Sequence, residues 1–207
     1  MSIQVKFCGM RRQEDISYAN ECRPDYIGLV FAESRRQVTA EQAVRLLKRL
    51  DPQILSVGVF VNEPLDQILR IQEKAGLSVL QLHGDEDRRY ICELRRRCPA
   101  SVWKAVRVRE VQDIKRAESL EVDALLLDSF TSGAYGGTGQ TADWTEIQKA
   151  NISKRFFLAG GLREGNLADA IQTVHPFGVD LSGGIENDGM KDLAKMKAVI
   201  EIVRNFS

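Results

Sequence analysis

The sequence has few cysteines, few histidines and no long apolar run. Its four cysteines form no Cys-x-x-Cys pair, and with only two histidines the spacing typical of a structural zinc site is missing. No apolar stretch approaches the roughly 20 residues that a membrane-spanning helix requires. The opening residues, Met1 to Met10, lack the apolar core of a secretory signal. We therefore expect no metal site, no contact with a membrane, and a cytoplasmic location.

The chain also lacks an excess of charge of either sign. It carries 29 Lys and Arg against 29 Asp and Glu among 207 residues. A neutral chain has no general field to attract nucleic acid, so any anion that it binds must be held by a local site. A chain of this length buries enough apolar surface to fold without disulfides, and no linker or low-complexity tract divides it. We expect one domain, residues 1–207.

Short β-rich apolar runs alternate with longer amphipathic segments. Apolar residues recur at three and four positions in the longer segments, which indicates helices with one buried face. The predicted helices include Thr39–Leu50, Leu65–Ala75, Asp87–Arg97, Asp143–Ala150 and Met190–Val203. Thr39 with Gln42 resembles a capping box, and Gly76 fits a helix end. The predicted strands are Ile3–Phe7, Tyr26–Phe31, Ile54–Val61, Val79–Leu82, Val102–Val108, Ala124–Leu127, Phe156–Leu158 and Gly178–Leu181.

Strand and helix repeat about every 26 residues, an alternation that requires a parallel sheet. Eight such units predict an α/β protein with a closed (β/α)₈ TIM barrel, compact for a fold of typically about 250 residues. The alternative is an open doubly wound sheet, although the first strand is not followed by a Gly-x-Gly-x-x-Gly turn. In a barrel, functional groups belong at the carboxyl ends of the strands.

Paired glycines follow the seventh and eighth predicted strands. Gly160-Gly161 comes after Phe157-Leu158-Ala159, and Gly183-Gly184 comes 23 residues later after Ser182. Glycines at a strand exit let backbone N–H groups approach an anion closely, and barrels commonly bind phosphate after these two strands. The plain alternative is that the glycines only turn the chain. Two such pairs favour a phosphate site that includes Ser182.

A thiol and a carboxyl group follow two other strands. Cys8 lies at the end of the first strand and Asp128 at the end of the sixth. They form a candidate base and acid if the site adjusts their pKa values. Taken alone, Cys8 also fits an inert buried thiol and Asp128 a loop cap. We assign packing roles to the other three cysteines, Cys22, Cys92 and Cys98.

Other polar residues lie near strand ends. His83 follows the fourth strand and lines the predicted pocket, and Asp180 lies inside the eighth strand, where a carboxylate needs a partner or a ligand. Ser34-Arg35-Arg36 follows the second strand, and one arginine there is suited to bind a carboxylate through two parallel hydrogen bonds. The glycine-rich loop of residues 132–139 is either a cover for the site or a plain connection.

Together these residues resemble the phosphoribosylanthranilate isomerase family of tryptophan biosynthesis. The similarity rests on motifs that occur in the family's order along the whole chain: Lys6-Phe7-Cys8-Gly9-Met10, Gln81-Leu82-His83-Gly84, Leu127-Asp128-Ser129, Gly136-Gly137-Thr138-Gly139, Leu158-Ala159-Gly160-Gly161-Leu162 and Val179-Asp180-Leu181-Ser182. The family usually has Ser-Pro-Arg where this chain has Ser34-Arg35-Arg36, and Arg36 holds the matching place.

The resemblance implies an isomerase that performs an Amadori rearrangement of N-(5-phospho-β-D-ribosyl)anthranilate. It implies Asp128 as general acid, Cys8 as general base, and Arg36 facing the anthranilate carboxylate. It further implies no cofactor, a small phosphorylated substrate as the partner, and a monomer or homodimer. Two alternatives stay open at this stage. A related aminoaldose–aminoketose isomerase of histidine biosynthesis is expected to use paired aspartates, and a non-catalytic sugar-phosphate-binding barrel needs neither Cys8 nor Asp128.

Overall fold

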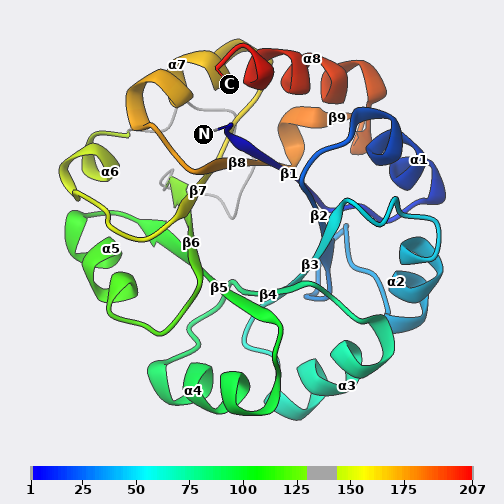
Figure 1. The fold of residues 1–207 in the computed structure, drawn as a ribbon, viewed down its shortest axis with the longest axis vertical. Coiled ribbons are helices and arrows are strands. Elements are labelled where there is room, and N and C mark those ends of the chain that lie inside the picture. The colour runs from blue at the N-terminus through cyan, green and yellow to red at the C-terminus, as the bar shows by residue number, and fades with distance from the viewer. Residues whose placement is uncertain (1, 130–143, 207) are drawn as a thin grey trace.

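Eight parallel strands close into a barrel at the centre of the molecule. The computed structural model describes residues 2–129 and 144–206, and each strand of the barrel pairs with its neighbours in chain order, β8 with β1 (Figure 1). The predicted closed barrel is confirmed, and the open sheet is wrong. The strands are β1 Gln4–Cys8, β2 Tyr26–Val30, β3 Leu55–Phe60, β4 Val79–Leu82, β5 Ser101–Val108, β6 Ala124–Ser129, β7 Phe156–Ala159 and β8 Gly178–Leu181.

A ring of helices surrounds the barrel (Figure 1). The helices are α1 Gln13–Cys22, α2 Ala40–Leu47, α3 Leu65–Ala75, α4 Arg88–Arg97, α5 Val111–Glu118, α6 Thr145–Lys149, α7 Glu164–Val174 and α8 Leu193–Arg204. The predicted capping box is present, because the Gln42 N–H donates to Thr39 Oγ1 at 3.2 Å and the Thr39 N–H donates to Gln42 Oε1 at 2.7 Å. Gly76 ends α3 with a left-handed φ of 62°, as predicted.

The segment between β8 and α8 differs from the prediction of a helix from Met190 onward. It holds a 3₁₀ turn, Gly183–Ile185, and an antiparallel pair of short strands, β9 Glu186–Asn187 and β10 Met190–Lys191. Asp188 and Gly189 turn this hairpin with φ values of 48° and 75°, and the sequence Asp-Gly favours such a turn. The helix begins only at Leu193, where Asp192 Oδ1 accepts the Lys195 N–H.

Alternate residues of each strand face the barrel interior and the surrounding helices. Along β6, Ala124 and Leu126 belong to the inner apolar cluster, whereas Leu125 and Leu127 pack in the outer layer against the helices. Aromatic rings fill the inner cluster, with the Trp103 and Phe157 rings stacked at 4.5 Å. The interior is therefore a packed core, and open space for a ligand lies beyond the strand ends.

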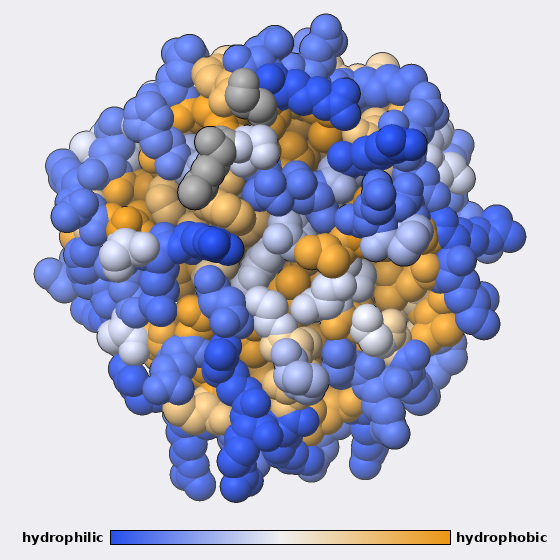
Figure 2. Space-filling view, viewed as in Figure 1, coloured by the Kyte–Doolittle hydropathy of each residue, from blue (hydrophilic) through white to orange (hydrophobic). Residues whose placement is uncertain are grey.

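Hydrophilic side chains surround the outer ring of helices, and apolar side chains lie between them and toward the barrel wall (Figure 2). This arrangement follows from the amphipathic pattern of the helices, each of which buries one face. Within residues 2–129 and 144–206, every helix falls short of the length and apolar character needed to cross a membrane.

Candidate active site

Cys8 and Asp128 face the interior at the carboxyl ends of β1 and β6. Asp128 lies two residues beyond Leu126, so it shares the inward side of its strand. Cys8 lies two residues beyond Lys6 and so shares its side of β1. The fully buried ammonium group of Lys6 contacts Asp180 on the neighbouring strand β8, with 2.9 Å between Lys6 Nζ and Asp180 Oδ1. The thiol and the carboxyl group are thus directed toward the same end of the barrel.

The Cys8 thiol lies in a buried and charged environment. Burial raises its pKa above the ordinary value, the ammonium groups of Lys6 and Lys191 oppose this rise, and Asp180 adds to it. Burial also disfavours the charged form of Lys6, but Asp180 and Cys8 outweigh it and raise the pKa of Lys6. The net result is a raised pKa of Cys8, so the two ammonium groups offset only part of the effect of burial on the thiolate, the form able to accept a proton.

His83 lies next to Asp128 and is held by Gln81, a residue that the sequence analysis did not single out. The Gln81 side-chain amide nitrogen lies 2.9 Å from His83 Nδ1, and His83 Nε2 lies 3.8 Å from Asp128 Oδ2. The contact with Gln81 orients the imidazole so that its Nε2 faces the Asp128 carboxyl group. The signal in the sequence was a buried polar residue two positions before His83, on the same side of the strand.

The two Gly-Gly exits lie side by side because β7 pairs with β8. Gly160 and Gly161 adopt left-handed φ values of 89° and 63°, which favour glycine. A Cβ on Gly184 would overlap the Leu162 carbonyl, so the two exits touch. The Ser182 hydroxyl donates to the Cys8 carbonyl at 3.2 Å, which joins this glycine-lined region to β1. The predicted phosphate residues are therefore close together and adjacent to Cys8.

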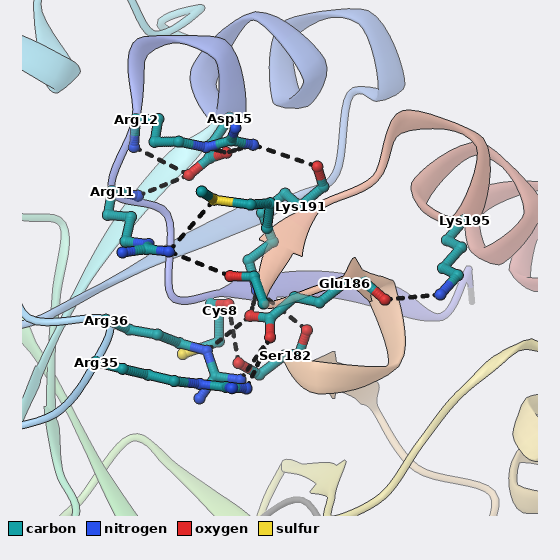
Figure 3. A network of polar contacts seen from close by, with 12 residues as sticks. Cys8, Arg11, Arg12, Asp15, Arg35, Arg36, Ser182, Glu186, Lys191 and Lys195 are labelled. Atoms are coloured by element: carbon teal, nitrogen blue, oxygen red, sulfur yellow. Dashed lines mark hydrogen bonds and ion pairs between the residues drawn. The ribbon is translucent and has the colours of Figure 1, made fainter.

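Arg36 reaches this region and contacts a partner that the sequence analysis missed. Its guanidinium contacts both carboxylate oxygens of Glu186 on β9 at 2.7 Å, and Figure 3 shows it beside Ser182 and Cys8. The Arg36 side chain is 22% exposed, whereas that of Arg35 is 64% exposed. Arg35 also donates to Glu186 Oε2, at 3.0 Å, but Arg36 is the more buried of the two arginines.

Some predictions fall elsewhere. The glycine-rich loop of residues 132–139, with its Gly136–Gly139 motif, lies outside the described residues. The packing role predicted for Cys92 is wrong, because Cys92 is exposed on α4, while Cys22 and Cys98 are buried as expected.

A closed parallel barrel with an inward thiol, an inward carboxyl group and paired glycines after β7 and β8 defines a class of protein, the (β/α)₈ enzymes of small phosphorylated substrates. Comparison with known proteins identifies the particular family. The family model for N-(5'-phosphoribosyl)anthranilate isomerase matches residues 5–202. An N-(5'-phosphoribosyl)anthranilate isomerase of Thermoanaerobacter sp. (strain X514) is 46% identical over 204 residues, 99% of either chain.

Solved structures agree with this assignment. A phosphoribosyl anthranilate isomerase of Thermotoga maritima superimposes with a TM-score of 0.89 at 36% identity, covering 98% of this chain and 99% of the other; another structure describes the Thermotoga maritima enzyme as dimeric. A further isomerase, in complex with reduced 1-(o-carboxyphenylamino)-1-deoxyribulose 5-phosphate, has a TM-score of 0.83 at 32% identity, covering 98% and 99%. The chain belongs to the phosphoribosylanthranilate isomerase family, so the predicted family and isomerase class are confirmed.

Proposed function

We propose that this protein converts N-(5-phospho-β-D-ribosyl)anthranilate to 1-(2-carboxyphenylamino)-1-deoxy-D-ribulose 5-phosphate, with Cys8 and Asp128 as its acid–base pair. The observation that carries this proposal is the placement of both groups on the inward side of β1 and β6, at the end where the glycine exits of β7 and β8 meet. A binding protein for sugar phosphates needs neither group, and paired aspartates are absent from these two positions.

The reaction requires one proton to be added and another to be removed. Asp128 donates a proton to the furanose ring oxygen, so that the C1–O bond breaks and a Schiff base forms between C1 and the anthranilate nitrogen. Cys8 then removes the proton from C2, and the C2–H electron pair forms an enolamine, which tautomerises to the ketone. The neighbouring ammonium group of Lys6 opposes the rise in the Cys8 pKa that burial causes, and so makes the thiolate that this step uses easier to form than it would be without Lys6.

The substrate is held at both ends in this proposal. Gly160, Gly161, Ser182, Gly183 and Gly184 bind the phosphate, and Arg36 binds the anthranilate carboxylate. His83 and Asp180 contact the part of the substrate between them. Fixing two charged ends places C2 and the ring oxygen between Cys8 and Asp128, which lowers the entropy loss on reaching the transition state.

Several coarser expectations complete the proposal. We infer one barrel domain over residues 1–207, a monomer or homodimer, and a cytoplasmic location without nucleic-acid partners or a cofactor. The dimeric Thermotoga maritima relative supports the homodimer as one of the two forms. Sedimentation of the purified protein distinguishes them.

Substitution of the acid and the base tests the mechanism. We expect Cys8→Ser and Asp128→Asn each to lower kcat by about 10²–10⁴-fold, because each removes a proton transfer in the transition state. The affinity for inorganic phosphate should stay within about tenfold in both variants. The measurement is the loss of fluorescence of freshly prepared phosphoribosylanthranilate.

Cys92→Ser is the matched control, since Cys92 is an exposed cysteine on α4, and it should retain full turnover. Activity comparable to the parent protein in either Cys8→Ser or Asp128→Asn would remove this assignment of roles. Absence of turnover in the parent protein would instead support a non-catalytic barrel.

A further inference from the structure

Glu186 is a buried carboxylate whose acceptor positions are all used by cations. Its Oε1 accepts from Arg36 Nε at 2.7 Å and from Lys191 Nζ at 2.8 Å. Its Oε2 accepts from Nη2 of Arg36 at 2.7 Å and from Nη2 of Arg35 at 3.0 Å. A carboxylate has about four lone-pair directions, so Glu186 has none left for another donor.

The protein holds this carboxylate firmly in its ionised form. The Glu186 side chain is only 5% exposed. Burial disfavours its charge, but hydrogen bonds from Arg36 and Lys191 outweigh this effect and lower the pKa of Glu186 to about 2. Its backbone is fixed as well, because Lys195 Nζ donates to the Glu186 carbonyl at 2.7 Å. Glu186 is thus an ionised anchor, held by hydrogen bonds from several cations beside the candidate site (Figure 3).

Glu186 binds one edge of the Arg36 guanidinium and leaves another edge facing away from Glu186. A guanidinium has five N–H groups, and Glu186 takes the side edge made by Nε and one hydrogen of Nη2. The outer edge, made by Nη1 and the second hydrogen of Nη2, has the same forked shape and suits a second carboxylate. A Cβ on Gly9 would overlap Arg36 Cδ. The Arg36 side chain therefore packs against the backbone of Gly9, directly after Cys8.

We propose that Glu186 is a positioning residue for substrate recognition: it locks the side edge of Arg36 so that the outer edge is presented to the carboxylate of the anthranilate ring. This role rests on the proposed function of the site. Lys191 connects the anchor to the other end of the substrate, because its Nζ also donates to the Ser182 carbonyl at 3.0 Å. With one carboxylate against Arg35, Arg36 and Lys191, the cluster keeps an excess positive charge that favours a substrate with two anionic ends.

The test replaces Glu186 by glutamine, which keeps the volume but loses the charge and one acceptor oxygen. Arg36 then keeps at most one of its two hydrogen bonds and rotates more freely. We expect Glu186→Gln to raise KM for phosphoribosylanthranilate about tenfold with kcat within about threefold, since binding rather than chemistry is affected. The inhibition constant of inorganic phosphate should change less than twofold.

A double-substitution cycle distinguishes positioning from a purely structural role. In an Arg36→Lys background the guanidinium, with its paired N–H groups, is already absent. Glu186→Gln should then raise KM by less than a further twofold. Glu41→Gln is the matched control, since Glu41 pairs with Lys74 at the exposed surface, and it should leave KM unchanged. An equal rise in KM in both backgrounds, or an equal weakening of phosphate inhibition, would overturn the proposal.

A binding measurement separates this proposal from the proposed activity. Binding of anthranilate itself, followed by its own fluorescence, requires no turnover. If the parent protein fails to turn over substrate, the proposed function fails, yet a weaker affinity for anthranilate in Glu186→Gln still supports the anchor. If turnover is normal and anthranilate affinity is unchanged in Glu186→Gln, the anchor alone is wrong.

Discussion

At the scale of single residues, the most consequential contact is the buried ion pair of Lys6 and Asp180 beneath Cys8. Both side chains lie inside the barrel, with exposed fractions of 0% and 9%. A buried pair contributes little net stability, but the loss of one partner leaves an uncompensated charge. The same ammonium group opposes the rise in the pKa of Cys8 that burial causes. Lys6 therefore connects the stability of the barrel to the basicity of the thiol.

Replacing Lys6 by methionine should change both properties. We expect Lys6→Met to lower the free energy of unfolding by about 3–5 kcal/mol, because Asp180 is left unpaired. The pKa of Cys8 should rise, so the ascending limb of kcat/KM against pH should move to higher pH and activity near neutrality should fall. Chemical denaturation and the pH profile measure the two effects. A double variant, Lys6→Met with Asp180→Asn, should recover most of the stability; an unchanged pH profile in Lys6→Met would contradict the electrostatic role.

At the scale of elements, a carboxylate at the end of α5 fastens this helix to the segment before β7. Glu118 Oε1 accepts from the Ser153 N–H at 2.7 Å and from the Ser153 hydroxyl at 2.9 Å, and Glu118 Oε2 accepts from Lys115. Burial opposes ionisation, but these hydrogen bonds outweigh it and lower the pKa of Glu118 to about 2. The end of α5 and the segment before β7 are held together chiefly by the ionised form of Glu118.

The stabilisation by Glu118 should depend on pH with a definite sign. Because the folded-state pKa lies below the ordinary value of 4.5, the contribution is complete above about pH 4.5 and is lost as the pH falls toward 2. We expect Glu118→Gln to lower the free energy of unfolding by about 1–3 kcal/mol at pH 7 and by progressively less below pH 4.5. Urea titrations at several pH values measure this difference. Glu93→Gln, which removes a surface ion pair with Arg96, should cost about 0–1 kcal/mol; an equal loss there would show that burial of Glu118 is irrelevant.

The elements also show what could be predicted from the sequence. Periodicity located the strands well, since a strand buried on both faces is a continuous apolar run, as in Ala124–Leu127. It placed the start of α8 too early, because Met190 and Lys191 belong to a hairpin whose Asp188-Gly189 turn was overlooked. The roles proposed for strand-end residues came from their spacing and from the family resemblance.

Partners distant in sequence were not predictable in this way. Glu186 follows the eighth strand and reads as an ordinary surface carboxylate, and only the folded chain brings it to Arg36, 150 positions earlier. Gln81 was likewise hidden within an apolar strand, although its place two residues before His83 was a usable signal. Residues that act through other residues leave a weaker trace in a single sequence than residues that carry reactive groups.

At the scale of the whole molecule, the barrel separates its stabilising core from its candidate site along one axis. The inner aromatic cluster lies nearer the amino-terminal ends of the strands, as Trp103 does in the third position of β5. The reactive groups lie at the strand ends, as at Cys8 and Asp128. A closed barrel requires this division, because a packed interior leaves room for a substrate only beyond it.

Two substitutions should therefore have opposite consequences. We expect Trp103→Ala to lower the free energy of unfolding by about 3–5 kcal/mol, because it opens a cavity where the indole stacks on Phe157 at 4.5 Å. The kcat of the folded protein should stay within about threefold. Cys8→Ser should leave the melting temperature nearly unchanged while kcat falls by about 10²–10⁴-fold. Thermal denaturation and turnover measured on the same preparations provide the comparison. A Trp103→Ala protein that kept its stability but lost turnover would contradict this division. The residues of the barrel interior would then contribute directly to the chemistry at the strand ends.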